Sequence, residues 1–534
     1  MDENRQRQRE FDRYAEATRT RPRPPARLWS YRLLGLLVAA VAWWWLGDSP
    51  GLGSDARWVA AITVLMALWW MTEAIPLAAT ALLPIVLIPA LTARGLAETS
   101  APYASPIIFL FLGGFLIAIA MEKWNLHRRI ALLTLLRVGA QPRRIVLGMM
   151  LATGFLSMWV SNTATTLMML PIGLSVLALV AEGNGGAGAV AAPAGEGRHR
   201  RGRVDFIADP QVRRFGTCLL LSIAWAASMG GLGTLLGSPP NAILAGYAAA
   251  ELGRRIGFLE WMMVGVPLAF SFILIAWWLM TRWLYRFELE EIPGSREMLR
   301  GELRRLGRAG QGEKLVLLVF ATAAFLWVVP GLLAGLPGLG RGWAWLDALD
   351  DTAIAIGAGL SLFLLPGRGR HEMLLTWKDA EEGLPWGVLL LFGGGLSLAS
   401  AVAGTGLDQW LGQQVAGLGV LPTLLLVAAV VTLVVFLTEV TSNTATAATF
   451  IPVLGGIAVG IGADPLLLLL PAAFAATSAF MLPVGTPPNA IVFGTGAVGI
   501  AQMARGGFVL NLVAIVLITG LCWLLGGYAF GIRW

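Results

Sequence analysis

The sequence predicts an all-α, polytopic membrane protein. Of its 534 residues, 57% are hydrophobic and only 13% are charged, and the mean hydropathy is +0.71. Apolar stretches of about 15–25 residues follow one another along the chain, and this length spans the roughly 30 Å hydrocarbon core of a bilayer. Two polar phrases, each present twice, interrupt these stretches. Polar backbone at such depth is tolerated only around a cavity or a binding site.

The composition also excludes several functional classes. Cys218 and Cys522 lie far apart and the three histidines do not cluster, so neither disulfide nor zinc chemistry is indicated. The net charge of +7 comes largely from arginines in the short connections between apolar stretches, where they indicate the cytoplasmic side of a membrane protein. We therefore expect contact with membrane lipid, no nucleic-acid partner and no organic cofactor.

The N-terminal region changes character near residue 30. Residues 1–30 are polar and rich in arginine and proline, which predicts a disordered basic cytoplasmic tail. The following apolar stretch is not succeeded by a small-residue cleavage site. We therefore assign residues 31–50 to an uncleaved first transmembrane helix and not to a signal peptide.

The two repeated phrases occur in the same order in each half of the chain. Ser-Asn-Thr-Ala-Thr occupies residues 161–165 and again residues 442–446. A second phrase, Gly-Ser-Pro-Pro-Asn-Ala at residues 237–242, recurs as Gly-Thr-Pro-Pro-Asn-Ala at residues 485–490. Proline removes a backbone donor and glycine allows close backbone approach, so the second phrase predicts an interruption of a membrane helix.

Each Ser-Asn-Thr phrase lies in an apolar run about twice as long as one crossing, at residues 143–181 and 421–461. Such a run could be one long broken crossing or a re-entrant hairpin with the phrase at its tip. Arginines flank the first run on both sides, which places both of its ends in the cytoplasm. No Lys or Arg occurs between Lys378 and Arg505, so both ends of the second run should lie outside. We therefore expect two re-entrant hairpins that enter from opposite sides.

A count from a cytoplasmic N-terminus gives 11 transmembrane helices plus the two hairpins, and it leaves the C-terminus outside. The halves are then inverted-topology repeats, a plan typical of secondary transporters with the substrate at the midplane. The insertion at 182–203 is expected to be a flexible cytoplasmic loop. The predicted domains are repeat 1 at 51–290 with a broken helix at 214–250, a cytoplasmic linker at 291–314, and repeat 2 at 315–534 with a broken helix at 464–500.

The phrases bring together groups suited to an anion and to a cation. Asn162 and Asn443 offer carboxamides, and the helix that begins after each tip directs free N–H groups and a partial positive charge toward it. Gly237 and Gly485 allow bare backbone carbonyls, which suit a hard cation, to come close. Beyond Arg144, at its start, the first hairpin contains no Lys or Arg, and the second hairpin and both Pro-Pro phrases contain none. A dianion bound at the tips would therefore lack a positive side chain. We expect inorganic cations to bind with it.

These paired phrases, together with WMTEAIP at residues 70–76 and FGGG at residues 392–395, resemble the divalent anion/sodium symporter family. The resemblance covers the chain from about residue 55 to the C-terminus. It implies a homodimeric, elevator-type carrier that takes up dicarboxylates, citrate or, in some branches, sulfate, usually with several Na⁺.

The resemblance also implies which residues form the site. The ligands of one Na⁺ site would be Ser157, Ser161, Asn162 and backbone at Gly237, and those of its counterpart would be Thr438, Thr441, Asn443 and backbone at Gly485. The anionic substrate would be held by Ser161, Asn162, Thr163, Ser238, Pro239, Ser442, Asn443, Thr444, Thr486 and Pro487.

We therefore predict Na⁺-coupled symport of C4-dicarboxylates (succinate, malate, fumarate) into the cytoplasm across a bacterial inner membrane. The alternatives are a Na⁺-independent dicarboxylate or tricarboxylate exchanger on the same fold, or a sulfate or citrate symporter. An enzyme is disfavoured because the sequence lacks His-Glu-x-x-His, Ser-Lys and paired intramembrane Asp motifs. For Glu439, beside Thr438, we favour a structural hydrogen-bond partner over a cation ligand.

Overall fold

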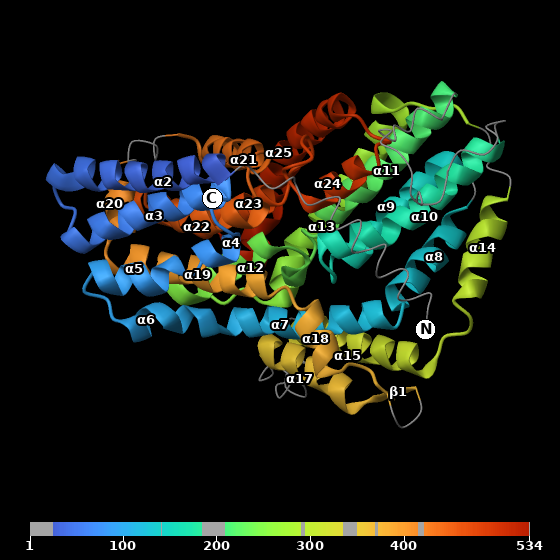
Figure 1. The fold of residues 1–534 in the computed structure, drawn as a ribbon, viewed down its shortest axis with the longest axis horizontal. Helices are drawn as coiled ribbons and strands as arrows, with labels where there is room; N and C mark the ends of the chain where they lie inside the picture. Colours follow the sequence, from blue (N-terminus) through green and yellow to red (C-terminus); the bar gives the residue numbers. More distant parts are fainter. Residues whose placement is uncertain are drawn as a thin grey trace.

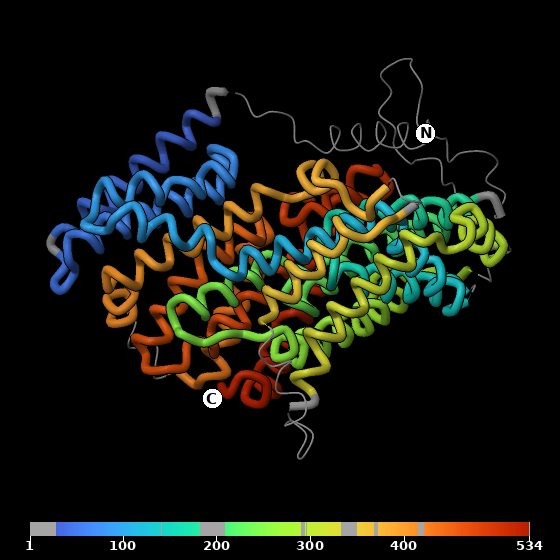
Figure 2. The backbone as a smooth tube through the Cα atoms, turned by 90° about the horizontal axis from the view of Figure 1, so that it is seen from below, coloured from blue at the N-terminus to red at the C-terminus, as the bar shows by residue number. Residues whose placement is uncertain are grey.

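The computed structural model describes residues 25–139, 141–183, 209–289, 294–334, 350–368, 372–414 and 421–532. The described chain is mostly helical, with one short antiparallel pair of strands, β1 (Pro366–Arg368) and β2 (Glu372–Met373). The bundle is elongated, with α2 (Pro25–Trp45) and α3 (Ser54–Thr72) toward one end and α14 (Ser295–Arg305) toward the other (Figures 1 and 2). Residues 1–24 of the predicted tail and 184–203 of the predicted insertion lie outside the described residues.

The first helix begins earlier than predicted. Residues 25–30, which the sequence analysis assigns to the disordered tail, form the start of α2. Pro25 occupies the first helical position, where its fixed φ suits the helix and its missing N–H is not needed. The helix therefore extends six residues beyond the predicted start of the first transmembrane helix at residue 31. α2 packs on α3 through Ala39, Ala61 and Leu65, and only 11% of its apolar span is buried.

The first Ser-Asn-Thr phrase lies at a tight turn between two helices. The elements of this region are α9 (Pro142–Ser157), α10 (Asn162–Gly183), α11 (Pro210–Gly230), the short 3₁₀ turn η3 (Leu235–Gly237) and α12 (Pro239–Glu251). Both α9 and α10 pack on α11. Gly173 lies against Ile223 and Gly216 lies against Leu177, so α10 runs antiparallel to α11. The chain reverses direction between α9 and α10, and the helix that follows is interrupted at the Pro-Pro phrase.

The second half repeats this order of elements. They are α21 (Thr423–Thr438), α22 (Asn443–Gly460), α23 (Leu466–Ala476) and α24 (Pro487–Gly494). Both α21 and α22 pack on α23, as α9 and α10 pack on α11. The second Ser-Asn-Thr phrase again lies between the paired helices, and the second Pro-Pro phrase again begins a helix.

The other helices surround these two units. Their bounds are α4 (Leu77–Thr80), α5 (Leu83–Leu91), α6 (Leu96–Ser100), α7 (Pro106–Lys123), α8 (Leu126–Val138), α13 (Phe258–Leu279), α15 (Gln311–Ala334), α17 (Asp351–Leu364), α18 (Trp377–Gly383), α19 (Trp386–Gly404), α20 (Leu407–Gln414) and α25 (Ile500–Phe530). Three short turns complete the described chain: η1 (Leu46–Asp48), η2 (Ala101–Ala104) and η4 (Met280–Leu284). α7 packs so closely on α17 that a Cβ added at Gly113 would overlap the backbone of Ala355.

Among the described residues, eight helices are long and apolar enough to cross a membrane. Two of these spans, Asn162–Ala181 and Asn443–Gly460, are the second arms of the helical pairs just described. Four further apolar helices are shorter than a full crossing. Helix length and composition support a membrane protein, whereas the number of crossings and their sidedness stay predictions.

Candidate functional site

The Asn162 side chain, at the turn between α9 and α10, faces three oxygen atoms from three segments. Its inward amide atom lies 2.6 Å from Ser157 Oγ, 3.0 Å from the carbonyl oxygen of Ala227 and 3.2 Å from that of Gly237. Ala227 lies in the last turn of α11 and Gly237 lies in η3. The interruption between α11 and α12 therefore brings backbone oxygens to the hairpin tip.

The Asn443 side chain has the same surroundings in the second half. Its inward amide atom lies 2.8 Å from Thr438 Oγ1, 3.1 Å from the carbonyl oxygen of Ala476 and 3.3 Å from that of Gly485. Thr438 Oγ1 also donates to the Ala476 carbonyl, at 2.8 Å. We call these two sets the Asn162 cluster (Ser157, Asn162, Ala227, Gly237) and the Asn443 cluster (Thr438, Asn443, Ala476, Gly485).

The orientation of each amide decides what a cluster can bind. With Nδ2 inward, each amide donates to the hydroxyl and both carbonyls. With Oδ1 inward, four oxygens converge and the hydroxyl is the only possible proton donor among them. Four uncharged oxygens of this kind form a ligand set for a hard cation such as Na⁺. Six of the eight predicted Na⁺ ligands therefore come together, three in each cluster.

The other two predicted ligands have different partners. Ser161 Oγ accepts the backbone N–H of Ala164 at 3.2 Å and so caps α10. Thr441 donates to the carbonyl of Leu437 at 2.9 Å, and its hydroxyl lies 2.6 Å from that of Thr446. These hydroxyls fix the start of α10 and the tip of the second helical pair.

The remaining predicted substrate residues lie beside the clusters. Thr163 and Ser442 are partly buried, and Thr444 is buried. Ser238 and Thr486 precede α12 and α24 with nearly equal backbone angles, at φ −149° and ψ 142° against φ −152° and ψ 144°. Each is followed by a proline that starts the helix, partly buried at Pro239 and exposed at Pro487.

An asparagine holds the interrupted backbone in each half. Asn241 Nδ2 donates to the carbonyl oxygens of Gly231 and Thr234, both at 2.8 Å. Asn489 Nδ2 donates to the carbonyls of Ala479 and Leu482, at 3.2 and 3.1 Å. These bonds satisfy carbonyls that the broken helices leave without intrahelical partners. Asn241 and Asn489 belong to the repeated Pro-Pro phrases, but the phrases alone do not indicate that these side chains bind backbone carbonyls.

The two halves meet at the site. Ser238 Oγ, from the first half, lies 3.0 Å from Thr477 Oγ1, from the second. In addition, α10 contacts α24 and α12 contacts α22. Four helices therefore begin close to the clusters, and helix N-termini attract anions. Among the described residues, no group of three or more His, Cys, Asp or Glu side chains could hold a metal ion.

Glu439 is a structural partner and not a member of the Asn443 cluster. Its carboxylate is 3% exposed and accepts the backbone N–H groups of Phe480, Met481 and Leu482 at 2.7 to 3.0 Å. It also accepts from Asn511 Nδ2 at 2.8 Å. The preference for a structural role is confirmed, because the carboxylate holds the loop between α23 and α24.

Two cluster members, the carbonyl oxygens of Ala227 and Ala476, are not predictable from the sequence motifs. No side-chain signal marks a backbone ligand in an apolar helix. The one available hint is position, since each alanine lies about ten residues before the glycine of a Pro-Pro phrase. That hint identifies the end of a helix but not the carbonyl that faces the amide.

Comparison with known proteins supports the fold. Solved structures of the Alcanivorax borkumensis YdaH transporter and of Neisseria gonorrhoeae MtrF match with TM-scores of 0.56 and 0.54, at 16% and 13% identity. The matches cover 88% of this chain and 99% of YdaH, and 95% of this chain and 96% of MtrF. At such low identity they show a shared fold with membrane transporters and no more.

Sequence relatives are much closer. The sodium-dependent dicarboxylate transporter SdcS of Staphylococcus saprophyticus is 43% identical over 476 residues, covering 89% of this chain and 87% of the relative. SdcS of Staphylococcus aureus is 42% identical over 463 residues, covering 86% and 84%. The family profile described as the sodium:sulfate symporter transmembrane region matches residues 26–528. The chain therefore belongs to the divalent anion/sodium symporter family, which its repeated motifs predict.

Proposed function

We propose that the protein is a secondary transporter that couples the inward movement of Na⁺ to the uptake of a C4-dicarboxylate such as succinate, malate or fumarate. The observation that carries this proposal is the pair of matched oxygen clusters around Asn162 and Asn443. The relatives that are named sodium-dependent dicarboxylate transporters support both the cation and the anion. Their names also give no reason to expect enzymatic activity.

The clusters explain why a cation should drive the transport. Their ligands are hydroxyl, amide and carbonyl oxygens without formal charge, so each Na⁺ brings a full positive charge into the site. Each positive charge that moves inward gains about 2.3 kcal/mol per 100 mV of membrane potential. Ion binding thus supplies both the local charge and the driving force.

The anion needs that charge. Beyond Arg144, at the start of the first hairpin, neither the hairpins nor the Pro-Pro phrases contain Lys or Arg, and helix N-termini at the site contribute only about half a positive charge each. We propose that bound Na⁺ ions neutralise the substrate between Asn162 and Thr163 on one side and Asn443 and Thr444 on the other. Two matched tips suit a substrate with a carboxylate at each end.

The membrane arrangement is also a proposal. We infer 11 crossings, two re-entrant hairpins that enter from opposite sides, and inverted repeats that move as an elevator within a homodimer. A bacterial plasma membrane, a cytoplasmic N-terminus and an external C-terminus complete this arrangement. The eight long apolar helices and the matched order of elements in the two halves support it.

Uptake into proteoliposomes tests the function. We expect labelled succinate to accumulate with an inward Na⁺ gradient and not when K⁺ replaces Na⁺. Equal uptake in the two salts would contradict coupling, and uptake driven by internal succinate alone would favour the exchanger. Competition by malate, fumarate, citrate and sulfate would then assign the substrate class.

Site variants test whether the clusters carry transport. Asn162→Ala and Asn443→Ala should each abolish Na⁺-driven uptake while the purified protein stays folded. Ser175→Ala is a matched control, because Ser175 is exposed on α10 and its hydroxyl donates only to the Pro171 carbonyl at 2.8 Å. Wild-type rates in either asparagine variant would refute the site.

A further inference from the structure

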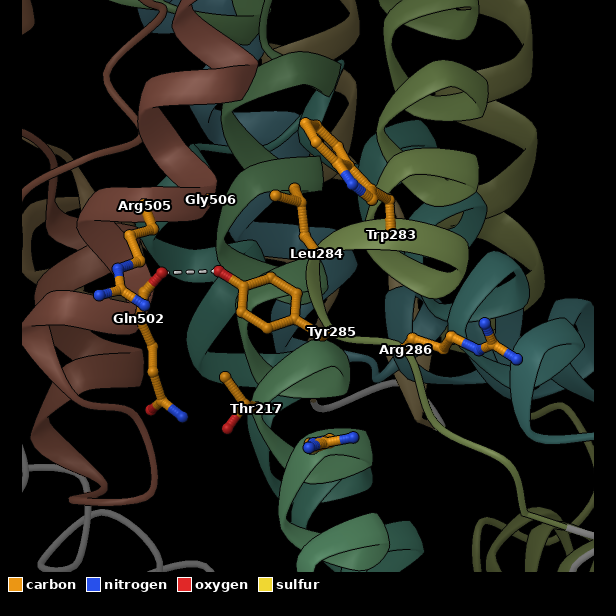
Figure 3. Close-up of a pocket in the computed structure, with 9 residues that line it drawn as sticks. Thr217, Trp283, Leu284, Tyr285, Arg286, Gln502, Arg505 and Gly506 are labelled. Atoms are coloured by element: carbon orange, nitrogen blue, oxygen red, sulfur yellow. Dashed lines mark hydrogen bonds between the residues drawn. The ribbon is translucent and has the colours of Figure 1, made fainter.

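A second hollow, apart from the clusters, lies where three helices reach one end of the bundle. α11 begins there, α13 ends there in the π-helical turn η4, and α25 begins there. The volume of the hollow is about 320 Å³ (Figure 3). The hollow therefore lies near an end of each of these three helices.

The floor of the hollow is well packed. The Tyr285 hydroxyl donates to the backbone carbonyl of Gln502 at 2.8 Å, and this bond joins η4 to the first turn of α25 (Figure 3). Glycine is required at position 506, because a Cβ there would overlap the Tyr285 hydroxyl and the Trp225 ring. π-helical turns are rare in proteins, but many of those that occur lie at functional sites. The shape of the hollow thus depends on defined contacts and not on loose side chains.

The rim carries positive charge that the described chain does not neutralise. Arg214, on α11, and Arg505, on α25, are exposed, and neither has an ion-pair partner among the described residues. Arg286 also lines the hollow, but its guanidinium points away from Arg505 and pairs with Glu288 (Figure 3). Arg214 and Arg505 therefore offer two guanidinium groups from different helices to one anion.

An apolar surface continues from this rim along α25. Phe508 and Leu512 follow Arg505 at three and seven positions, on the same face of the helix, and they are 44% and 45% exposed. Trp283, in η4, is 66% exposed beside the hollow, as is typical of tryptophan at a membrane interface. The elements that line the hollow thus expose basic, aromatic and apolar side chains.

We propose that this hollow binds an anionic phospholipid, with the phosphate between Arg214 and Arg505 and an acyl chain along Phe508 and Leu512. Arginine recognises phosphate through paired, charge-assisted hydrogen bonds. Basic pockets between membrane helices favour anionic headgroups. A lipid held in this way joins the start of α11 to the start of α25. The proposal does not depend on the identity of the transported anion.

Native mass spectrometry of the purified full-length protein tests this site, with palmitoyl-oleoyl phosphatidylglycerol, the matching phosphatidylcholine and inorganic phosphate as separate probes. We expect saturable binding of phosphatidylglycerol that exceeds binding of phosphatidylcholine. The double variant R214Q/R505Q should weaken phosphatidylglycerol binding about 30-fold, which corresponds to about 1 kcal/mol for each arginine removed. The variant R214K/R505K keeps the positive charges but loses the paired hydrogen bonds of each guanidinium, so its binding should lie between that of the wild type and that of R214Q/R505Q.

Arg286→Gln is the matched control, since Arg286 lines the same hollow but has its own acidic partner. It should bind phosphatidylglycerol like the wild type. Unchanged binding in R214Q/R505Q would overturn the proposal. Protection against thermal unfolding by inorganic phosphate, equal to that by phosphatidylglycerol, would also overturn it, because a soluble anion would then be the ligand.

Discussion

Asn162 and Asn443 connect parts of the chain that are distant in sequence. Each amide lies at a hairpin tip and faces carbonyls from a helix interruption, at Ala227 and Gly237 in one half and at Ala476 and Gly485 in the other. The matching partners and distances, 2.6 to 3.2 Å and 2.8 to 3.3 Å, make coincidence a poor explanation. Each asparagine therefore links a hairpin tip to the helix interruption in its own half of the chain.

The hydroxyl in each cluster can be removed with little change of shape. Ser157→Ala and Thr438→Val each delete one proposed cation ligand, which should cost about 2 kcal/mol of Na⁺ binding, or roughly 30-fold in affinity. We expect the Na⁺ concentration for half-maximal succinate uptake to rise accordingly. The measurement is uptake against Na⁺ concentration, with Ser175→Ala as control. A Na⁺ activation curve equal to that of the wild type would rule out a ligand role for these hydroxyls.

Gly231 controls the space around the Asn162 amide. A Cβ at this position would lie 2.7 Å from Asn162 Oδ1 and 3.0 Å from the Gly237 carbonyl oxygen. Gly231→Ala should therefore displace the amide and reduce Na⁺-driven uptake at least about tenfold, with a stability cost of about 1–3 kcal/mol. Gly357→Ala is the control, because no atom lies within 4 Å of its added Cβ. If both variants transport equally well, the Asn162 cluster does not need its present geometry.

The segments between α11 and α12 and between α23 and α24 are held differently in the two halves. In the second half, the Glu439 carboxylate accepts three consecutive backbone N–H groups. The equivalent position in the first half is Met158, whose backbone carbonyl accepts from the Thr234 hydroxyl. The halves thus share the clusters but not the support behind them, and in the described part of the chain the buried carboxylate of Glu439 has no counterpart at Met158.

Glu439→Gln tests the support of the segment between α23 and α24. The new amide NH₂ would face backbone N–H donors, so we expect a loss of about 2 kcal/mol in the free energy of unfolding and a lower melting temperature. Thermal unfolding in detergent measures this, with the exposed Glu381→Gln as control. A melting temperature unchanged from the wild type would show that the carboxylate is not needed to hold the loop.

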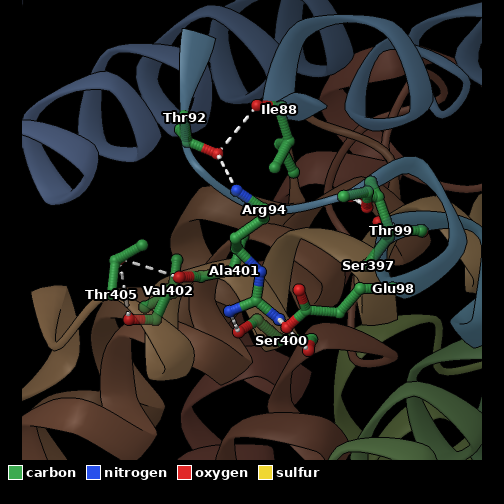
Figure 4. A network of polar contacts seen from close by, with 11 residues as sticks. Ile88, Thr92, Arg94, Glu98, Thr99, Ser397, Ser400, Ala401, Val402 and Thr405 are labelled. Atoms are coloured by element: carbon green, nitrogen blue, oxygen red, sulfur yellow. Dashed lines mark hydrogen bonds and ion pairs between the residues drawn. The ribbon is translucent and has the colours of Figure 1, made fainter. Parts of the chain in front are cut away.

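Arg94 joins helices from the two halves of the chain. It lies between α5 and α6 with its side chain only 13% exposed, and it pairs with Glu98 (Figure 4). Its guanidinium also donates to the carbonyl of Ser400 at 3.0 Å and to the Ser400 hydroxyl at 3.1 Å, both on α19 (Figure 4). Because Arg94 has internal partners, its position carries no information about which side of the membrane it faces.

Arg94→Gln should weaken the packing of the α5 to α6 connection on α19. A glutamine is too short to reach Ser400 and leaves Glu98 unpaired, so we expect a loss of about 1–3 kcal/mol in stability. Arg255→Gln is the control, because the Arg255 side chain is 85% exposed and its ion pair with Asp350 spans 3.3 Å. Equal melting temperatures for the two variants would contradict a structural role for Arg94.

Much of the site could be predicted because the chain carries it twice. The repeated phrases identify Asn162, Asn443 and the glycines of the interruptions without knowledge of the fold. Ser161 and Thr441 fit the same pattern, yet their hydroxyls bond to Ala164 and to Leu437. A hydroxyl close to a backbone N–H or carbonyl can bond locally, and sequence alone does not show which partner it takes.

The amino-acid sequence by itself determined the membrane class, the two matched halves and the family, because hydrophobic length and repeated polar phrases are properties of the chain in order. Only the tertiary structure decided that Ala227 and Ala476 complete the clusters, that Ser238 meets Thr477, and that Glu439 holds a loop. The physical reason is that backbone carbonyls look alike in sequence. Their role depends on which helix ends where and on what the fold places beside it.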